Sequence, residues 1–193
     1  MMFIKDEEFI RGNCPMTKEE IRILSVAKLN LREDFNVLDI GAGTGSVSIQ
    51  MSKICSKGMV TSIEMDKEAL EVLKLNKQKF NVPNMNIIEG DAVDLSNSIE
   101  DYFDAIFIGG SSGSIEEIIK RYALKLKSQG TMVLNFITID NAYKAIKTLE
   151  ELNFSTECSQ ISVSKTRGKS HMLMANNPIF ILSARNNGGN SIG

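Results

Sequence analysis

The stretch Val37-Leu-Asp-Ile-Gly-Ala-Gly-Thr-Gly45 decides the fold of this chain. Its first four residues fit a short buried strand, and three glycines at alternate positions follow directly. A glycine-rich turn between a strand and a helix lets a ligand approach the backbone without meeting a Cβ atom. The spacing differs from the dinucleotide-binding pattern Gly-x-Gly-x-x-Gly, because Ser46 stands where the third glycine would be. The carboxylate of Asp39 would repel a phosphate but attract a cationic ligand, directly or through water.

The composition is that of a single soluble domain. The chain has 193 residues, of which 42% are hydrophobic and 24% charged, and its net charge of −2 provides no general basic field for nucleic acid. Its three cysteines are widely separated and indicate neither a disulfide framework nor a zinc site. No signal peptide and no run of roughly 18 apolar residues is present. We therefore expect a cytoplasmic protein without a bound metal, a membrane contact or a nucleic-acid partner.

Strand-like and helix-like segments alternate outward from the central stretch. We expect a first helix that begins with a capping box at Thr17 and runs to about residue 29. The expected strands are residues 37–40, 59–64, 85–89, 102–108, 131–137, 156–164 and 179–184. Strand and helix alternate five times before a final pair of strands with no helix between them, which indicates an α/β fold with a mostly parallel sheet and helices on both faces. The last two strands should be antiparallel neighbours.

The predicted domain spans residues 1–185, and residues 186–193 read as a disordered tail. Ligands of such sheets bind outside the carboxyl ends of the strands. The glycine turn, Glu64, Asp91 and the segment Gly109–Gly113 all follow strand ends, so they should meet at one edge. Glu64 lies 19 residues after Gly45, the spacing of an acidic residue that accepts ribose hydroxyls, although a solvated carboxylate would also fit. Asp91, with Ala92 beside it, fits either an adenine contact or a helix cap.

The segment Asp39-Ile-Gly-Ala-Gly-Thr-Gly45 resembles motif I of the class I S-adenosylmethionine (SAM) methyltransferases, whose ligand carries an ammonium and a sulfonium group. This resemblance implies a Rossmann-like methyltransferase fold and SAM as cofactor, with S-adenosylhomocysteine as product. Another nucleotide-type ligand and a purely structural turn are the alternatives. The candidate cofactor-binding residues are Thr17, Asp39, Gly41, Ala42, Gly43, Thr44, Gly45, Glu64, Asp91, Ala92 and Gly109. Residues 1–30 are expected to cover the ligand edge.

A wider set of segments resembles the decarboxylating cobalt-precorrin-6B carbon-15 methyltransferase family of anaerobic cobalamin biosynthesis. The segments are Asp6–Gly12, Pro15–Arg22, Asp39–Ser48, Phe107–Ser111 and Asn177–Pro178. The likeness runs in unbroken order from about residue 6 to residue 185. It implies methylation of carbon 15 of a corrin precursor, loss of the carboxyl group from the carbon-12 acetate, and a homotetramer. It also implies SAM contacts at Thr17, the glycine turn, Glu64 and Ala92.

The segment Gly109-Gly-Ser-Ser-Gly113 would let a flat, bulky macrocycle approach the methyl group, although it would also fit a flexible connector. Gly110 and Ser111 are therefore candidate substrate contacts. A polycarboxylate substrate would favour cations, and the candidates are Arg11, Lys165, Arg167 and Lys169. Each of these could equally be a solvated surface charge. The composition of residues 165–170 indicates a mobile loop able to close over an anion.

No catalytic residue can be assigned from the sequence. A carbon in a conjugated macrocycle can be nucleophilic through its own electron delocalisation, so the single histidine, His171, is not expected to be an essential base. Two alternative functions remain open. One is a SAM-dependent methyltransferase acting on another small molecule or on RNA, and the other is a catalytically silent SAM-binding subunit.

Overall fold

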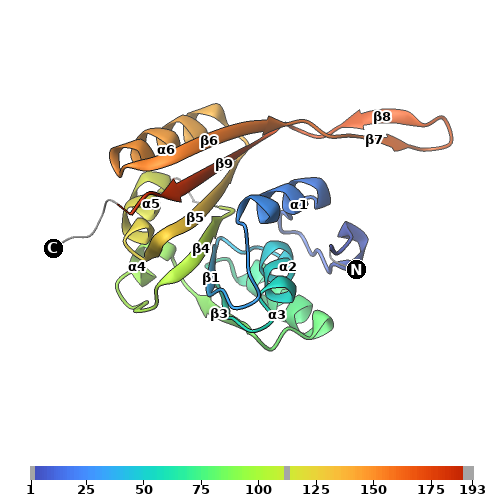
Figure 1. The fold of residues 1–193 in the computed structure, drawn as a ribbon. Helices are drawn as coiled ribbons and strands as arrows, with labels where there is room; N and C mark the ends of the chain where they lie inside the picture. Colours follow the sequence, from blue (N-terminus) through green and yellow to red (C-terminus); the bar gives the residue numbers. More distant parts are fainter. Residues whose placement is uncertain (1–2, 111–113, 189–193) are drawn as a thin grey trace.

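The computed structural model describes residues 3–110 and 114–188, and its centre is a seven-stranded sheet with the order β3-β2-β1-β4-β5-β9-β6 (Figure 1). The strands are β1 (Val37–Ile40), β2 (Val60–Glu64), β3 (Met85–Glu89), β4 (Phe103–Ile108), β5 (Leu126–Phe136), β6 (Phe154–Ile161) and β9 (Ile179–Asn186). Strand β9 is antiparallel to both of its neighbours, β5 and β6, and the other pairs are parallel. The predicted mostly parallel sheet with an antiparallel strand near the C-terminus is confirmed.

Helices cover both faces of the sheet (Figure 1). One face carries α1 (Glu19–Lys28), α2 (Ser46–Ile54) and α3 (Lys67–Phe80), and the other carries α4 (Ala92–Leu95), α5 (Ile115–Ala123) and α6 (Ile139–Glu151). Strand β4 shows why two cores form, because successive side chains of a strand point to opposite faces. Ile106 and Ile108 pack into the core under α5 and α6, whereas Ala105 and Phe107 pack into the core under α1 and α2.

The neighbouring strands β1 and β4 form the switch point of the sheet. After β1 the chain enters α2 on one face, and after β4 it continues to α5 on the opposite face. The two connections therefore leave the same edge in opposite directions. In sheets of this kind a crevice opens at such a point.

The residues before α1 form an N-terminal strap, residues 3–18, which includes the short helix η1 (Asp6–Glu8). Arg22 of α1 holds this strap although its side chain is fully buried. Its Nη1 donates to Asp6 Oδ1 at 3.0 Å and to the carbonyl of Thr17 at 2.8 Å. Its Nη2 donates to the carbonyl of Ile4 at 2.6 Å. One guanidinium thus fixes three points of the strap.

Asn76 of α3 makes a second attachment, and it is also fully buried. Its Oδ1 accepts a hydrogen bond from Ile10 N at 2.9 Å, and its Nδ2 donates to Ile10 O at 2.8 Å. The same Nδ2 donates to the carbonyl of Thr44 at 2.9 Å. The strap is therefore tied directly to the glycine turn that follows β1.

The predicted capping box at Thr17 is wrong. Helix α1 begins at Glu19, its N-cap is Lys18, and no side-chain hydrogen bond caps it. The carbonyl of Thr17 is instead bound by Arg22. Thr17 lies before the helix, in the strap, and its carbonyl is one of the groups through which Arg22 holds the strap.

The loop predicted at residues 165–170 is wrong for residues 165–167, which lie in a strand, whereas residues 168–170 lie in a turn, and their mobility stays a prediction. Strands β7 (Ser164–Arg167) and β8 (Met172–Ala175) form a separate hairpin that projects from the body as an arm (Figure 1). Gly168 and His171, with φ of 68° and 55°, make its turn, and His171 N donates to Gly168 O at 3.3 Å. All eight strand residues of the arm are exposed. Because neither strand has a buried face, the sequence lacks the alternation of apolar and polar residues that predicts a half-buried strand.

The C-terminal strand continues beyond its predicted end. β9 runs to Asn186, whose side-chain amide donates to the carbonyls of Leu126 at 3.5 Å and Lys127 at 3.4 Å, so the tail does not begin at residue 186. Residues 189–193 lie outside the described residues, and their disorder stays a prediction. In the part of the chain that the structure describes, no helix has the length and apolar character that a membrane span requires.

We predict that Arg22→Met destabilises the protein by about 3 kcal/mol, because breaking a buried ion pair leaves its partners unsatisfied. This value is the lower end of the usual range for breaking a buried ion pair, because the Asp6 side chain is 19% exposed and can be hydrated again. Urea unfolding at pH 7 measures the effect. The control Arg32→Met removes an exposed arginine and should change the free energy of unfolding by less than about 0.5 kcal/mol. Equal effects of the two substitutions would contradict the role of Arg22.

Candidate active site

A cavity of about 390 Å³ lies where β1, β2 and β4 end, within the size range of small-molecule sites. We call it the donor cavity. All but one of the predicted cofactor-binding residues line it: Thr17, Asp39, Gly41, Ala42, Gly43, Thr44, Glu64, Asp91, Ala92 and Gly109. The structure thus brings together residues from the strap, the glycine turn and the ends of four strands.

The glycine turn has little room for side chains. Gly41 has a φ of 71°, and a Cβ atom there would lie 2.8 Å from the backbone nitrogen of Gly110. At Gly43, with a φ of 56°, a Cβ atom would lie 3.3 Å from the carbonyl of Pro15 in the strap. Gly45 is the residue that does not line the cavity, and a Cβ atom there would collide with Leu73 of α3. The first two glycines therefore shape the donor cavity, whereas Gly45 allows helix packing.

Asp39 is the most unusual group of the donor cavity because its carboxylate is fully buried. Ser48 donates to its Oδ2, and Ser62 in turn donates to Ser48 Oγ at 2.9 Å. Its Oδ1 has no hydrogen-bond partner among the described residues. Burial raises the pKa of Asp39 to about 7; the Glu64 carboxylate also raises it, and the hydrogen bond from Ser48 opposes the shift. An unpaired buried carboxylate oxygen beside a cavity is suited to a cationic ligand.

Glu64, at the end of β2, holds the neighbouring backbone in place. Its Oε2 accepts a hydrogen bond from Gly43 N at 2.7 Å, and its Oε1 accepts from Met65 N at 2.8 Å and Asp66 N at 2.9 Å. A carboxylate offers about four lone-pair positions, so capacity remains for a ligand hydroxyl. The sequence placed this residue correctly at the edge of the cavity.

Asp91 has the capping role that its position allowed. Its Oδ1 caps α4 by accepting from Val93 N at 2.7 Å and Asp94 N at 3.3 Å, and the residue also lines the donor cavity, so an adenine contact stays a prediction. Ala92 lines the cavity as well, and its carbonyl accepts a hydrogen bond from Tyr122 Oη at 2.8 Å. The cap and this hydrogen bond fix the backbone on this side of the cavity.

Cys14 of the strap also lines the donor cavity. Burial raises the pKa of its thiol; its own backbone opposes the shift, and the Asp66 and Glu64 carboxylates add to it. The thiol therefore stays protonated near neutral pH, where a thiolate would be needed for nucleophilic attack. Within the described ranges, no group of three His, Cys, Asp or Glu side chains is arranged to hold a metal ion.

The candidate substrate residues are scattered. Gly110 lines the donor cavity, and Ser111 lies outside the described residues. Arg11 lies 3.9 Å from Asp6 on the strap, and Lys165 pairs with Glu20 of α1 at 2.6 Å. Arg167 ends β7 and Lys169 lies in the turn of the arm. The structure does not bring these four cations together at the donor cavity.

A family model described as a precorrin methyltransferase domain matches residues 8–186. The chain belongs to this family. It is 43% identical over 183 residues to the probable cobalt-precorrin-6B C(15)-methyltransferase (decarboxylating) of Sulfolobus acidocaldarius. This alignment covers 93% of this chain and 95% of the relative. It is 36% identical over 186 residues to the cobalt-precorrin-6B C(15)-methyltransferase (decarboxylating) of Salmonella typhimurium, covering 94% and 95%.

Among solved structures, a precorrin-6y C5,15-methyltransferase from Geobacter metallireducens superimposes with a TM-score of 0.91 at 34% identity. The match covers 96% of this chain and 99% of that one. The resemblance to the decarboxylating precorrin methyltransferases and the Rossmann-like methyltransferase fold are therefore both confirmed. The chain carries an enzymatic C-methyltransferase domain of this family.

Sequence reasoning missed two residues that shape the site of this family member. Arg22 and Asn76 hold the strap against the donor cavity, yet nothing in their sequence context marks them. Arg22 lies in a helix that reads as amphipathic, and Asn76 lies in the polar-looking second half of α3. Only the burial of both side chains shows their role.

We predict that Asp39→Asn stabilises the protein above about pH 7 but not near pH 4. The folded-state pKa of about 7 exceeds the ordinary value of 3.8, so the parent loses stability as pH rises between these values. A gap of about three pH units corresponds to at most about 4 kcal/mol. The measurement is urea unfolding of both proteins at pH 4.5, 6 and 8. A constant difference between them at all three pH values would contradict the raised pKa.

Proposed function

We propose that this chain transfers the methyl group of SAM to carbon 15 of cobalt-precorrin-6B and releases the carboxyl group of the carbon-12 acetate as carbon dioxide. The observation that carries the proposal is the donor cavity, in which a buried carboxylate has a free oxygen. The names of the relatives supply the acceptor and the decarboxylation. The alignments with these relatives cover nearly the whole length of the chain, so we infer that the chain catalyses the same reaction.

The residues of the donor cavity fit SAM. The unpaired Oδ1 of Asp39 can interact with a cationic ligand, and the Oγ1 of Thr44, also buried and without a partner among the described residues, offers a further hydrogen-bonding group. Glu64 would accept the ribose hydroxyls, and taking both would require Oε2 to share or release the amide of Gly43. Asp91 and Ala92 would lie beside the adenine. When bound, SAM supplies an electrophilic methyl group on a sulfonium.

The proposed reaction balances without a base. The carbon–carbon bond to the carboxylate breaks, its electron pair enters the conjugated ring, and carbon 15 forms the new bond to the methyl carbon while sulfur keeps the old bonding pair. One negative carboxylate and one positive sulfonium become neutral products, and no proton is lost overall. The position of His171 in the turn of the arm agrees with this, since it lines neither the donor cavity nor the second cavity described below. The protein's part is then alignment, which can contribute about 7–11 kcal/mol.

The direct test is incubation of the protein with SAM and cobalt-precorrin-6B, followed by mass analysis of the product. The proposal predicts one methyl group gained and one carbon dioxide lost. Methylation of a different small molecule or of RNA, with no turnover of cobalt-precorrin-6B, would favour the first alternative. SAM binding with no turnover of any of these acceptors would favour a silent subunit.

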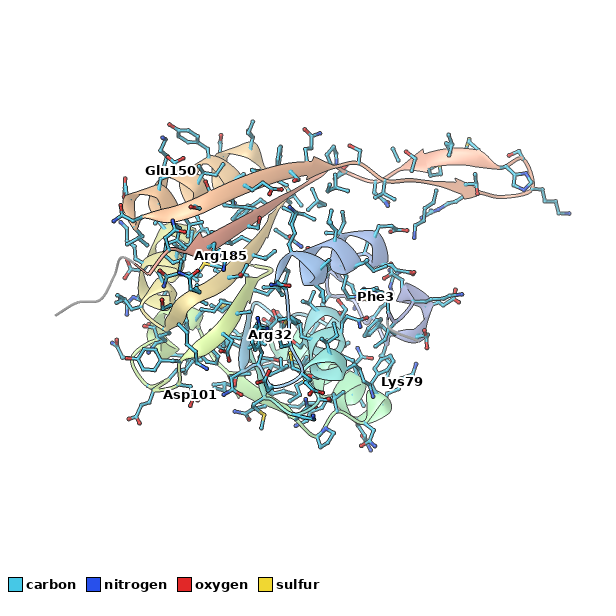
Figure 2. All side chains as sticks on the ribbon, viewed as in Figure 1. Phe3, Arg32, Lys79, Asp101, Glu150 and Arg185 are labelled. Atoms are coloured by element: carbon cyan, nitrogen blue, oxygen red, sulfur yellow. The ribbon has the colours of Figure 1, made fainter. Side chains whose placement is uncertain are left out.

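We also propose that the chain assembles into a homo-oligomer, a tetramer by its resemblance to the family, and that the arm forms the contact. Met172, Leu173 and Met174 of β8 are 59%, 67% and 40% exposed. Successive side chains of a strand point to opposite faces, and all the strand residues of the arm are exposed, so the arm has no core of its own. Figure 2 shows side chains that project from both sides of the arm. A lone hairpin is marginally stable in water, so a second copy that covers these side chains would stabilise it.

We predict that Leu173→Asp lowers the oligomeric state, measured by light scattering after size-exclusion chromatography. The control Leu124→Asp changes a leucine at the end of α5 that is 59% exposed, and it should leave the state unchanged. Both variants should keep the thermal stability of their folded body. An unchanged mass in Leu173→Asp would show that the contact lies elsewhere.

The expected cytoplasmic location and the absence of a nucleic-acid partner stay predictions.

A further inference from the structure

A second cavity, of about 320 Å³, adjoins the donor cavity. Pro15, Thr17 and Gly109 line both cavities, so they form the boundary between them. The other lining residues of the second cavity are Met16, Lys18, Ile21, Asn135, Phe136, Ile137, Ile161, Val163, Asn176, Asn177 and Ile179. They come from the end of the strap, from α1, from the ends of β5 and β6, from the start of β9, and from the segments that join the arm to the sheet.

Part of the boundary between the cavities is backbone without a side chain. Gly109 brings no side chain, and a Cβ atom there would lie 3.0 Å from the ring of Phe107 and 3.3 Å from the carbonyl of Gly41. Methyl transfer needs the two reacting atoms within about 3–3.5 Å before reaction. An acceptor in the second cavity would meet a donor-cavity ligand only at this boundary. The geometry therefore allows one place of transfer.

The second cavity suits a flat apolar ring edge. Ile21 and Phe136 are 5% and 6% exposed, and the half-buried Ile161, Val163 and Ile179 complete an apolar wall. One of its polar groups is the amide of Asn135, which exchanges hydrogen bonds of 2.9–3.0 Å with the hydroxyl of Ser25. A side-chain amide can make about four hydrogen bonds, so Asn135 keeps capacity for an acceptor substituent.

The volume limits what can enter. Cavities for small molecules run from about 300 to 1,000 Å³, so this one holds part of a macrocycle and leaves the remainder outside. Cations lie where that remainder would be. Lys18 lines the cavity and is exposed, and Lys165, at the start of the arm, pairs with Glu20 of α1 at 2.6 Å. Carboxylates outside the cavity can approach Lys18 directly and compete with Glu20 for Lys165.

We propose that this second cavity is the acceptor site, which receives the macrocycle edge bearing carbon 15 and the carbon-12 acetate while the other carboxylates stay near Lys18 and Lys165. The inference rests on the proposed function. When the macrocycle edge enters the cavity, the carbon-12 acetate carboxylate loses its hydration water. Release of this carboxylate as neutral carbon dioxide then removes its uncompensated charge. The same apolar wall would then serve both methyl transfer and decarboxylation.

The test fills the acceptor site without touching the donor cavity. Val163→Trp adds a large ring to the apolar wall, and the backbone there is held by the hydrogen bond from Asn176 N to Val163 O at 2.9 Å. Ile137→Trp is the second variant, because Ile137 is 72% exposed and its replacement spares the fold. Leu124→Trp, at 59% exposure on the far end of α5, is the control. Calorimetry measures SAM affinity, and steady-state assays measure methyl transfer to cobalt-precorrin-6B.

We expect both acceptor-site variants to bind SAM within about twofold of the parent and to lose about tenfold or more in kcat/KM, mainly through KM. The control should match the parent in both measurements. Parent-like kcat/KM in Val163→Trp and Ile137→Trp, with an active parent, would overturn the acceptor site and leave the proposed function standing. A parent that binds SAM but does not methylate cobalt-precorrin-6B would contradict the proposed function, and the inference with it.

Discussion

The adjacency of β1 and β4 at the centre of the sheet is the constraint on which the site depends. Because the chain leaves these strands toward opposite faces, their loops part and open the donor cavity. The two loops still touch, since Gly41 leaves no space between its Cα and the backbone of Gly110. Glu64 then fixes the turn from the next strand through the amide of Gly43. Sheet order, glycine position and one carboxylate thus produce the cavity together.

The chain keeps an unfavourable charge at this place. Asp39 is fully buried beside the cavity with one oxygen unpaired, and burial raises its pKa to about 7, which opposes folding at neutral pH. Large apolar cores on both faces can offset such a cost. A cationic ligand would remove it, so the group that weakens the free protein is the one that favours the bound state. The strap, held by Arg22 and Asn76, lines one side of the same cavity.

The parts of the structure that follow local rules could be predicted from the sequence. The alternation of strands and helices predicted the sheet. The residues that follow the strand ends, including Glu64 and Asp91, predicted the edge at which the donor cavity lies. The arm was missed because its exposed strands carry no buried face, and the second cavity was missed because its lining residues, among them Asn135 and Val163, come together only through tertiary packing. The capping box failed because α1 begins at Glu19 without a side-chain cap, and the carbonyl of Thr17 accepts a hydrogen bond from Arg22. The tertiary contacts that bury Arg22 and Asn76 leave no periodic signal in the sequence.

In the mechanism that we propose, the edge formed by β1 and β2 binds the nucleoside of SAM through Glu64. Titration calorimetry tests this by comparing the affinity of SAM for the parent and for Glu64→Ala, with Glu89→Ala as the control at the matching position of β3. We expect a loss of about 1.5–3 kcal/mol in Glu64→Ala, the value of a hydrogen bond to a charged group, and no change in the control. Unchanged SAM affinity in a folded Glu64→Ala protein would contradict it.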